Sequence, residues 1–223
     1  NQMQRENQDY INRYAKKGTG FERKKFIMQS LGYSLNNALS PFLFEEKNRR
    51  PVDYEDFVEN SPKIKYICQA IKSVRDWHEQ RGEEMSGVVV YSNRGKDYFH
   101  YIKEYLEKKY GFRKGVKHGR SATDEVEIIH GSLSTTKKES IKESFLLGKC
   151  KVVIGTATIK EGVDLQTHGT VLINAYPDWN PTDQKQLEGR IHRQGNRYGY
   201  VRIVMPLVQN SMDVFVFQKL EEK

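Results

Sequence analysis

The sequence predicts an α/β fold in which a parallel sheet carries helices on both faces, with a helical extension at the amino-terminal side. From Gly87 onward, short β-branched runs such as GVVVYS alternate with helix-like stretches such as RGKDYFHYIKEYLEKKY. Strands joined by helices of this length need crossover connections, which pair the strands in parallel. Hydrophobic residues make up 37% of the 223 residues, enough for one large globular domain.

The first part of the chain differs in composition from the rest. Residues 1 to about 44 mix apolar and basic residues at helical spacing, so we expect helices there. Residues 45–60, EEKNRRPVDYEDFVEN, are polar with a proline and predict a connector. We therefore divide the chain into a helical extension and linker, 1–60, and an α/β domain, 61–223.

An amphipathic helix is expected directly after residue 60. Ser61 is a candidate N-cap, Pro62 suits the first turn, and Gly82 is a plausible end. Its apolar face would consist of Ile64, Ile67, Cys68, Ile71 and Val74. Beyond it we expect strands at 87–92, 125–131, 151–157, 170–176 and 200–206. Helices are expected at 94–110, 134–148 (Ser134 near its start), 182–194 and 211–223.

Composition limits the function classes. Cys68 and Cys150 lie far apart inside apolar patterns, which predicts free buried thiols in a reducing compartment, taken here as the cytoplasm. The histidines and cysteines show no metal-ligand spacing, so no metal site is expected. No apolar run is long enough to cross a bilayer, so no membrane partner is expected.

The charge balance points to a polyanionic partner. The formal net charge is +8 and the sequence pI is about 9.3. The stretch KKYGFRKGVKHGR, residues 108–120, carries six basic side chains and no acid. It is either a solvated loop or a surface that follows phosphates.

In parallel sheets, ligands bind where the strands end, which selects the stretch KVVIGTATIKEGVDLQ, residues 151–166, for inspection. Hydroxyls of Thr156 and Thr158 suit phosphate oxygens, and Gly162 permits a close backbone approach. Asp164 suits a sugar hydroxyl as an acceptor. The alternative is an ordinary turn with a solvated Asp164.

The segment QLEGRIHRQGN, residues 186–196, places Arg190 and Arg193 three positions apart, on one face of the expected helix. Two neighbouring guanidinium groups repel each other, so a bound anion would explain the pair. The alternative is a surface helix whose arginines pair with Glu188 and Asp183. Such pairs contribute at most about 1 kcal/mol, which gives stability little reason for the arrangement.

Several segments, in order, resemble the conserved motifs of superfamily 2 helicases and translocases. VVVYSNRGKDYFHYIKEYL resembles motif IV, TATIKEGVDL motif V, and Q-x-x-G-R-x-x-R motif VI, with IIHGSLSTTKKESIKESF between motifs IV and V. DWNP followed by Q-x-x-G-R-x-H-R-x-G-N is similar to the Swi/Snf-type branch. Asp164 and Gly189 depart from that branch's usual asparagine and acidic residue. These two departures point to general superfamily 2 members or to phage and mobile-element relatives.

The resemblance implies the carboxy-terminal RecA-like lobe of a two-lobed ATPase, with ATP and Mg²⁺ between the lobes. Arg193 would be the catalytic arginine finger and Arg190 its catalytic neighbour. The nucleotide would contact Gly162, Asp164, Gln186, Arg190 and Arg193. The nucleic-acid backbone would contact Ser92, Asn93, Arg94, His130, Gly131, Thr156 and Thr158. Residues 1–60 resemble material lying between the lobes, with ALSPFLF as an apolar anchor onto this one.

The sequence contains no G-x-x-x-x-G-K-[ST] phosphate loop and no Asp-Glu-x-His run. The resemblance therefore implies that a first lobe of the same polypeptide holds the phosphates and Mg²⁺, and that this chain alone is inactive. Double-stranded DNA is the expected nucleic acid, and the basic run 108–120 becomes a candidate additional contact. A stand-alone nucleic-acid-binding module is the alternative. A small-molecule α/β enzyme is disfavoured because no G-x-G-x-x-G follows the first strand.

Overall fold

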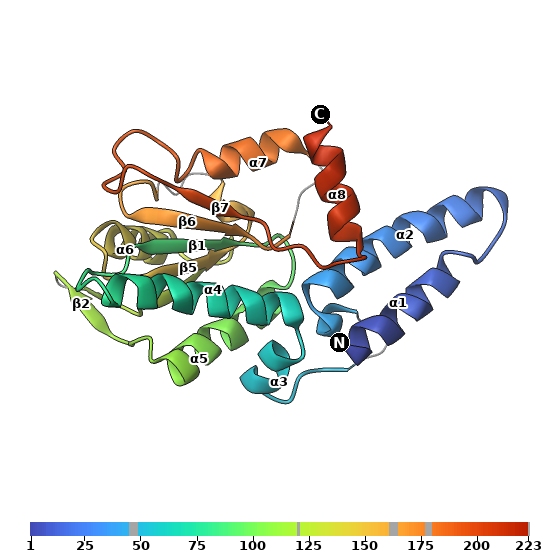
Figure 1. The fold of residues 1–223 in the computed structure, drawn as a ribbon, viewed down its shortest axis with the longest axis horizontal. Coiled ribbons are helices and arrows are strands. Elements are labelled where there is room, and N and C mark those ends of the chain that lie inside the picture. Colours follow the sequence, from blue (N-terminus) through green and yellow to red (C-terminus); the bar gives the residue numbers. More distant parts are fainter. Residues whose placement is uncertain (45–48, 120, 161–164, 177–179, 223) are drawn as a thin grey trace.

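Five strands form one parallel sheet, with the spatial order β4-β5-β1-β6-β7, within the described residues (Figure 1). The computed structural model describes residues 1–44, 49–119, 121–160, 165–176 and 180–222. The strands are β1 (Gly87–Tyr91), β4 (Val126–Ile129), β5 (Val152–Gly155), β6 (Gly169–Asn174) and β7 (Arg202–Val204). Four lie within predicted strands, β6 begins one residue before the predicted strand 170–176, and the parallel pairing is confirmed.

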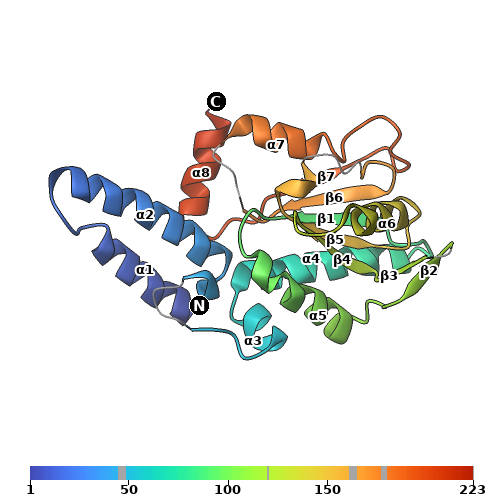
Figure 2. The same ribbon diagram turned by 180° about the vertical axis from the view of Figure 1, so that it is seen from behind.

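Alternate strand residues feed two separate hydrophobic clusters, one on each face of the sheet. Val88 and Val90 belong to one cluster, and Val89 and Tyr91 belong to the other. The first cluster is covered by α4 (Pro62–Glu79), α5 (Phe99–Tyr110) and α8 (Met212–Glu221). The second is covered by α6 (Thr135–Leu146) and α7 (Pro181–Glu188) (Figure 2). The predicted helices on both faces are therefore confirmed.

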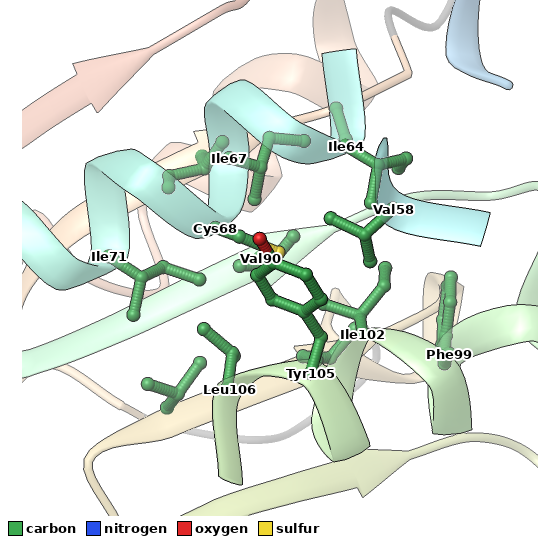
Figure 3. Close-up of a cluster of buried hydrophobic side chains, with 14 of the residues drawn as sticks. Val58, Ile64, Ile67, Cys68, Ile71, Val90, Phe99, Ile102, Tyr105 and Leu106 are labelled. Carbon is green, nitrogen blue, oxygen red and sulfur yellow. The ribbon is translucent and has the colours of Figure 1, made fainter. Parts of the chain in front are cut away.

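The apolar face of α4 packs against β1 and α5, as the spacing predicted (Figure 3). Ile64, Ile67, Cys68 and Ile71 are buried, and each large apolar side chain contributes roughly 1.5–3 kcal/mol. Pro62 occupies the first turn as expected, but the Ser61 side chain makes no capping bond. Its hydroxyl lies 2.7 Å from that of Ser40 instead, because the extension packs against the start of this helix.

The extension is helical, as predicted, and its helices are α1 (Gln2–Tyr14), α2 (Gly20–Leu39) and the short 3₁₀ helix η1 (Pro41–Leu43). The α1–α2 hairpin projects from the carboxyl ends of the strands (Figure 1). Aromatic edge contacts link Tyr14 to Tyr33 and Tyr33 to Phe44. Phe42 and Phe44 are buried, so the ALSPFLF stretch does anchor the extension.

The segment predicted as a connector contains a further helix, α3 (Tyr54–Glu59), which the sequence analysis did not predict. Asp53 caps it by accepting a hydrogen bond from Asp56 N. Phe57 and Val58 enter the same hydrophobic cluster as Phe42 and α4. Only these two apolar residues distinguish the helix from a polar loop. The hydrophobic core therefore continues across residue 60. The division of the chain at residue 60 stays a prediction.

A short antiparallel hairpin interrupts the basic run, with strands β2 (Val116–His118) and β3 (Ser121–Thr123). Strands of three residues are too short to show an alternation in sequence, which explains why they were not predicted. The hairpin follows α5 and precedes β4, so it lies at the amino end of the sheet (Figure 1).

One fully buried ion pair joins α4 to α8. Lys63 Nζ lies 2.5 Å from Asp213 Oδ2, and both side chains are 1% exposed. Lys63 Nζ also donates to the carbonyl of Ala175, directly after β6. Burial lowers the pKa of Lys63, while the Asp213 carboxylate opposes that shift. The two free cysteines, Cys68 and Cys150, are buried as predicted, and burial raises the pKa of both thiols.

Candidate nucleotide and nucleic-acid interfaces

The ends of three neighbouring strands bring most of the predicted nucleic-acid residues together. Tyr91 and Ile129 both pair with Gly155, so the residues that follow these strands emerge side by side. Ser92 N donates to Gly155 O at 3.0 Å, and Thr156 N donates to Ile129 O at 3.2 Å. We call this row, which comprises 92–94, 130–131 and 156–158, the carboxyl edge.

At β1, the carboxyl edge presents Asn93 and Arg94, which are both exposed. Ser92 is 2% exposed, and its hydroxyl donates to Arg94 O at 2.8 Å and accepts from Arg94 N. Gly95 follows with a φ of +77°, in the left-handed region that glycine adopts without strain. Ser92 therefore shapes the turn that exposes its neighbours, while its predicted contact with nucleic acid stays a prediction.

At β4 and β5, Gly131 and Thr158 lie against each other. A Cβ placed on Gly131 would be 4.0 Å from Thr158 Oγ1, so the two predicted residues form one surface. Lys138 Nζ donates to Gly131 O at 3.1 Å and adds a positive charge that the sequence analysis missed. His130 is half-buried, and its Nδ1 has no hydrogen-bond partner among the described residues.

The arginine segment is not a continuous helix, which corrects the expectation for 182–194. Asn180 caps α7 through Thr182 N as proposed, but α7 ends at Glu188 and Gly189 is its C-cap. Arg190 and Arg193 follow in turns, so they do not share a helical face. Ile191 still reaches the hydrophobic cluster beneath α6 and α7, together with Leu187.

Arg190 is hydrogen-bonded to both ends of the segment that resembles motif V. Its Nε donates to Lys160 O at 2.9 Å, and its carbonyl accepts from Leu165 N at 3.2 Å. Gly162 and Asp164 lie between those two attachment points in the chain but outside the described residues. Trp179 lies outside them too. Arg193 is exposed, three residues beyond Arg190, and Gln186 is exposed on α7.

The arginine loop, defined here as residues 189–201, lies away from the carboxyl ends of the strands. Asn196 Nδ2 donates to Gly169 O at 2.7 Å, and Arg197 N donates to Thr167 O. Gly169 begins β6, so the loop lies at the amino side of the sheet. The short α7 runs back from the carboxyl edge before the loop begins, which explains the displacement (Figure 1). The motif V segment thus runs from the carboxyl edge to the arginine loop.

Lys160 is a site residue that sequence reasoning passed over. It is buried, its Nζ lies 4.9 Å from the centre of the Tyr91 ring, and Asp183 Oδ2 is 3.9 Å away. It thereby connects β1, motif V and α7 with one side chain. Its position between Thr158 and Gly162 was the available signal, but nothing in the sequence showed which neighbours it would contact.

Three of the six basic side chains in the run 108–120 pair with nearby carboxylates. Lys109 pairs with Glu55 at 2.9 Å and Lys114 with Glu107 at 2.9 Å. Arg113 donates through Nε and Nη2 to Glu125 Oε1, at 2.9 and 2.6 Å. Arg120 lies outside the described residues. These carboxylates, together with the position at the amino side of the sheet, favour the interpretation as a solvated structural segment.

Within the described ranges, every helix is too short or too polar to cross a bilayer. The same residues contain no group of three His, Cys, Asp or Glu side chains placed to hold a metal ion.

The sheet order, the carboxyl edge and the arginine loop define a RecA-like lobe of the helicase type. A family model of the helicase conserved C-terminal domain matches residues 62–195, more than half of the chain, and the chain belongs to this family. This agrees with the superfamily 2 motifs.

Two relatives share sequence with the chain. The transcription-repair-coupling factor of Rickettsia bellii is 33% identical over 79 residues, covering 35% of this chain and 7% of the relative. That of Borreliella burgdorferi is 23% identical over 144 residues, covering 64% of this chain and 12% of the relative. The chain thus spans a small fraction of the length of the curated relatives it matches.

The fold itself is similar to a solved structure, the SWI2/SNF2 ATPase core of Sulfolobus solfataricus in complex with dsDNA. The TM-score is 0.69 at 18% identity, over 100% of this chain and 41% of that one. The match includes the helical extension, which lies outside the residues matched by the family model. At this identity the likeness shows the fold, and the fold agrees with the resemblance to the Swi/Snf-type branch.

Proposed function

We propose that this chain is the second motor lobe of an ATP-dependent DNA helicase or translocase. It would supply the arginine finger, Arg193, to ATP held by a first lobe of the same polypeptide, and would contact the nucleic-acid backbone along its carboxyl edge. One observation carries this proposal. Arg190 is hydrogen-bonded to Lys160 and Leu165, at the two ends of the motif V segment, and Arg193 is exposed three residues further on.

The cations of the arginine loop fit a triphosphate in their chemistry. Arg190 is held at its Nε and its carbonyl, which fixes its backbone, and Arg193 extends into solvent where a neighbouring lobe could approach. A guanidinium placed there would stabilise the negative charge that develops on the terminal phosphate during transfer. Gly162, Asp164 and Gln186 would complete the nucleotide contacts. The Mg²⁺ ligands belong, in this proposal, to the first lobe.

The carboxyl edge would bind the phosphate backbone rather than the bases. Exposed Asn93, Arg94 and Gly131, with the half-buried hydroxyls of Thr156 and Thr158, offer donors suited to phosphate oxygens. Such contacts position a strand without reading its sequence, so little sequence preference is expected. The dsDNA bound to the Sulfolobus solfataricus relative supports duplex DNA as the ligand.

The alternative function is a nucleic-acid-binding module that does not take part in catalysis. It requires the carboxyl edge but gives no role to Arg193 or to the double attachment of Arg190. The motor proposal accounts for both regions, and the binding module accounts for one.

The test is ATP turnover by the full-length gene product, with and without duplex DNA, beside its Arg193→Ala variant. We expect DNA-stimulated turnover that falls by about 10³–10⁵-fold in the variant, the range typical of an arginine finger. Arg202→Ala, an exposed arginine on β7, is the matched control and should retain turnover. An ATP turnover rate that changes neither with DNA nor in the Arg193→Ala variant would favour the binding-module alternative. The isolated chain should show no turnover.

A further inference from the structure

A basic cleft lies between the extension and the loop that follows β1. Its volume is about 770 Å³, and Asn93 and Arg94 of the carboxyl edge form part of its wall. The opposite wall comes from the end of the extension, including Phe42, Arg49 and Arg50. A smaller hollow of about 470 Å³ between α2 and the strand ends is bordered by the same Asn93 and Arg94. The predicted nucleic-acid surface therefore continues onto the extension.

The two walls are held together by packing at Gly95. A Cβ placed on Gly95 would lie 3.3 Å from Leu43 Cδ1, so η1 rests directly on the turn that follows Arg94. The Arg49 guanidinium lies 5.6 Å from the centre of the Phe42 ring and 3.8 Å from Asp56 Oδ1. Its side chain is nevertheless 55% exposed, so it can still face a ligand. Arg50 is exposed and makes no hydrogen bond or ion pair with the described residues.

The charges in the cleft are strongly one-sided. Among the described residues that line it, the permanently charged side chains are Arg49, Arg50, Arg94, Lys96 and Asp97. Four cations thus face one carboxylate among these residues. The basic run 108–120 shows the opposite arrangement, with carboxylates on Lys109, Arg113 and Lys114. Arg50 has no such pair with a described residue, and the Arg49 contact with Asp56 is long, at 3.8 Å, so both guanidinium groups can replace the counterions of a phosphate chain.

We propose that Arg49 and Arg50, together with Arg94 and Lys96, form a phosphate-backbone site that extends the nucleic-acid path from the carboxyl edge onto the extension. The ligand is a nucleic-acid strand, bound through successive phosphates and without base readout. This inference rests on the proposed function because it assumes nucleic acid at the carboxyl edge. It goes beyond that function because Arg49 and Arg50 lie outside the residues matched by the family model.

The test is equilibrium binding of the full-length protein to a fluorescent duplex of about 30 base pairs, followed by anisotropy over a range of salt concentrations. Arg49→Ala/Arg50→Ala should weaken binding by roughly tenfold for each lost contact. The slope of log K against log salt should become shallower by about 1 to 2, which a purely structural defect would not produce. Arg49→Lys/Arg50→Lys should keep most of the slope.

The comparison variant is Lys108→Ala/Lys117→Ala, which removes the same charge from exposed positions of the basic run. It should change affinity by no more than about twofold. Two results would overturn the proposal that this cleft binds phosphates: an equal or larger loss of affinity in this variant, or an unchanged salt slope in Arg49→Ala/Arg50→Ala. Either result leaves the proposed function standing. Wild-type protein that binds no nucleic acid overturns both. Because Arg49 also contacts Phe42 and Asp56, Arg50→Ala alone is measured too, and it should reproduce about half of the change in slope.

Discussion

The carboxyl edge and the arginine loop are held in place in different ways. The carboxyl edge follows strands that are buried on both faces, and ladder bonds such as Ser92 N to Gly155 O continue into it. The arginine loop is held by a few bonds from its own side chains and amides, including Asn196 to Gly169 O. Gly195 and Gly199 adopt positive φ within it. One region continues the strands of the core, and the other is a loop attached to it at a few points.

This difference agrees with the two proposed tasks. A phosphate-backbone surface gains from rigid spacing, because its contacts repeat along a regular polymer. An arginine finger must meet a nucleotide on another lobe, so it gains from a loop that adjusts when the lobes close. Arg190 and Lys160 limit that adjustment by tying the start of the loop to motif V.

The largest effect is expected where the carboxyl side of the sheet joins the core. Lys63→Met leaves Asp213 buried without its partner, and we expect the free energy of unfolding to fall by about 3–5 kcal/mol. Urea denaturation measures it. Lys72→Met on the same helix removes an exposed pair with Asp76 and should cost less than about 1 kcal/mol. Equal losses of unfolding free energy in Lys63→Met and Lys72→Met would mean that the buried ion pair stabilises the fold no more than the exposed one.

Acid should weaken the arginine-loop side in particular. Burial, with the charges of Lys151 and Arg197, lowers the pKa of His168 from 6.5 to about 4. Between these values the unfolded chain binds a proton that the folded protein does not, so stability is complete above pH 6.5 and falls as pH is lowered. The expected loss from His168 is about 2 kcal/mol between about pH 7 and about pH 5.

Chemical denaturation at the two pH values measures this loss. His168→Gln should show a correspondingly smaller change between them, since it no longer takes up that proton. His100→Gln, at an exposed histidine, serves as the control and should keep the wild-type difference. Identical pH dependence in wild type and His168→Gln would contradict the assignment.

The smallest effect is expected for the loop anchor itself. Asn196→Ala removes the bond to Gly169 O and the acceptor for Tyr198 N, and should cost about 1–2 kcal/mol. Hydrogen exchange should accelerate in the arginine loop and stay unchanged in β1 and β5. Gln194→Ala, its exposed neighbour, should stay within about 0.5 kcal/mol of wild type. Acceleration throughout the sheet would show that the loop and the core open together.

Strands β1, β4, β5 and β6 could be predicted because they are largely buried runs rich in β-branched residues. Gly148 and Pro62 mark helix boundaries by their own backbone preferences. The residue at which α7 ends could not be predicted from the sequence. Residues 182–194 keep a helical period, yet α7 ends at Glu188 with Gly189 as its C-cap. Likewise, the carboxylates that pair with the basic run come from Glu55, Glu107 and Glu125, whose approach depends on tertiary structure.

For the candidate site, the sequence motifs named the residues, but their arrangement needed the fold. The strand-end rule placed Asn93, Gly131 and Thr158 correctly on one edge. Arg193 lies away from that edge, because α7 carries the chain back across the sheet before the loop begins. Lys160 and the cleft at Arg50 depend on contacts between distant segments, which no local pattern encodes.

The two buried thiols lie on opposite sides of the sheet. Cys68 belongs to the cluster beneath α4 and α5, and Cys150 belongs to the cluster beneath α6 and α7. Since a raised pKa and burial keep both unreactive, each can be modified only when its own layer opens. The modification rate of each cysteine therefore reports how often the helix layer that covers it opens. The labelling rates of the two cysteines under native conditions would report whether the layers separate independently or as one cooperative unit.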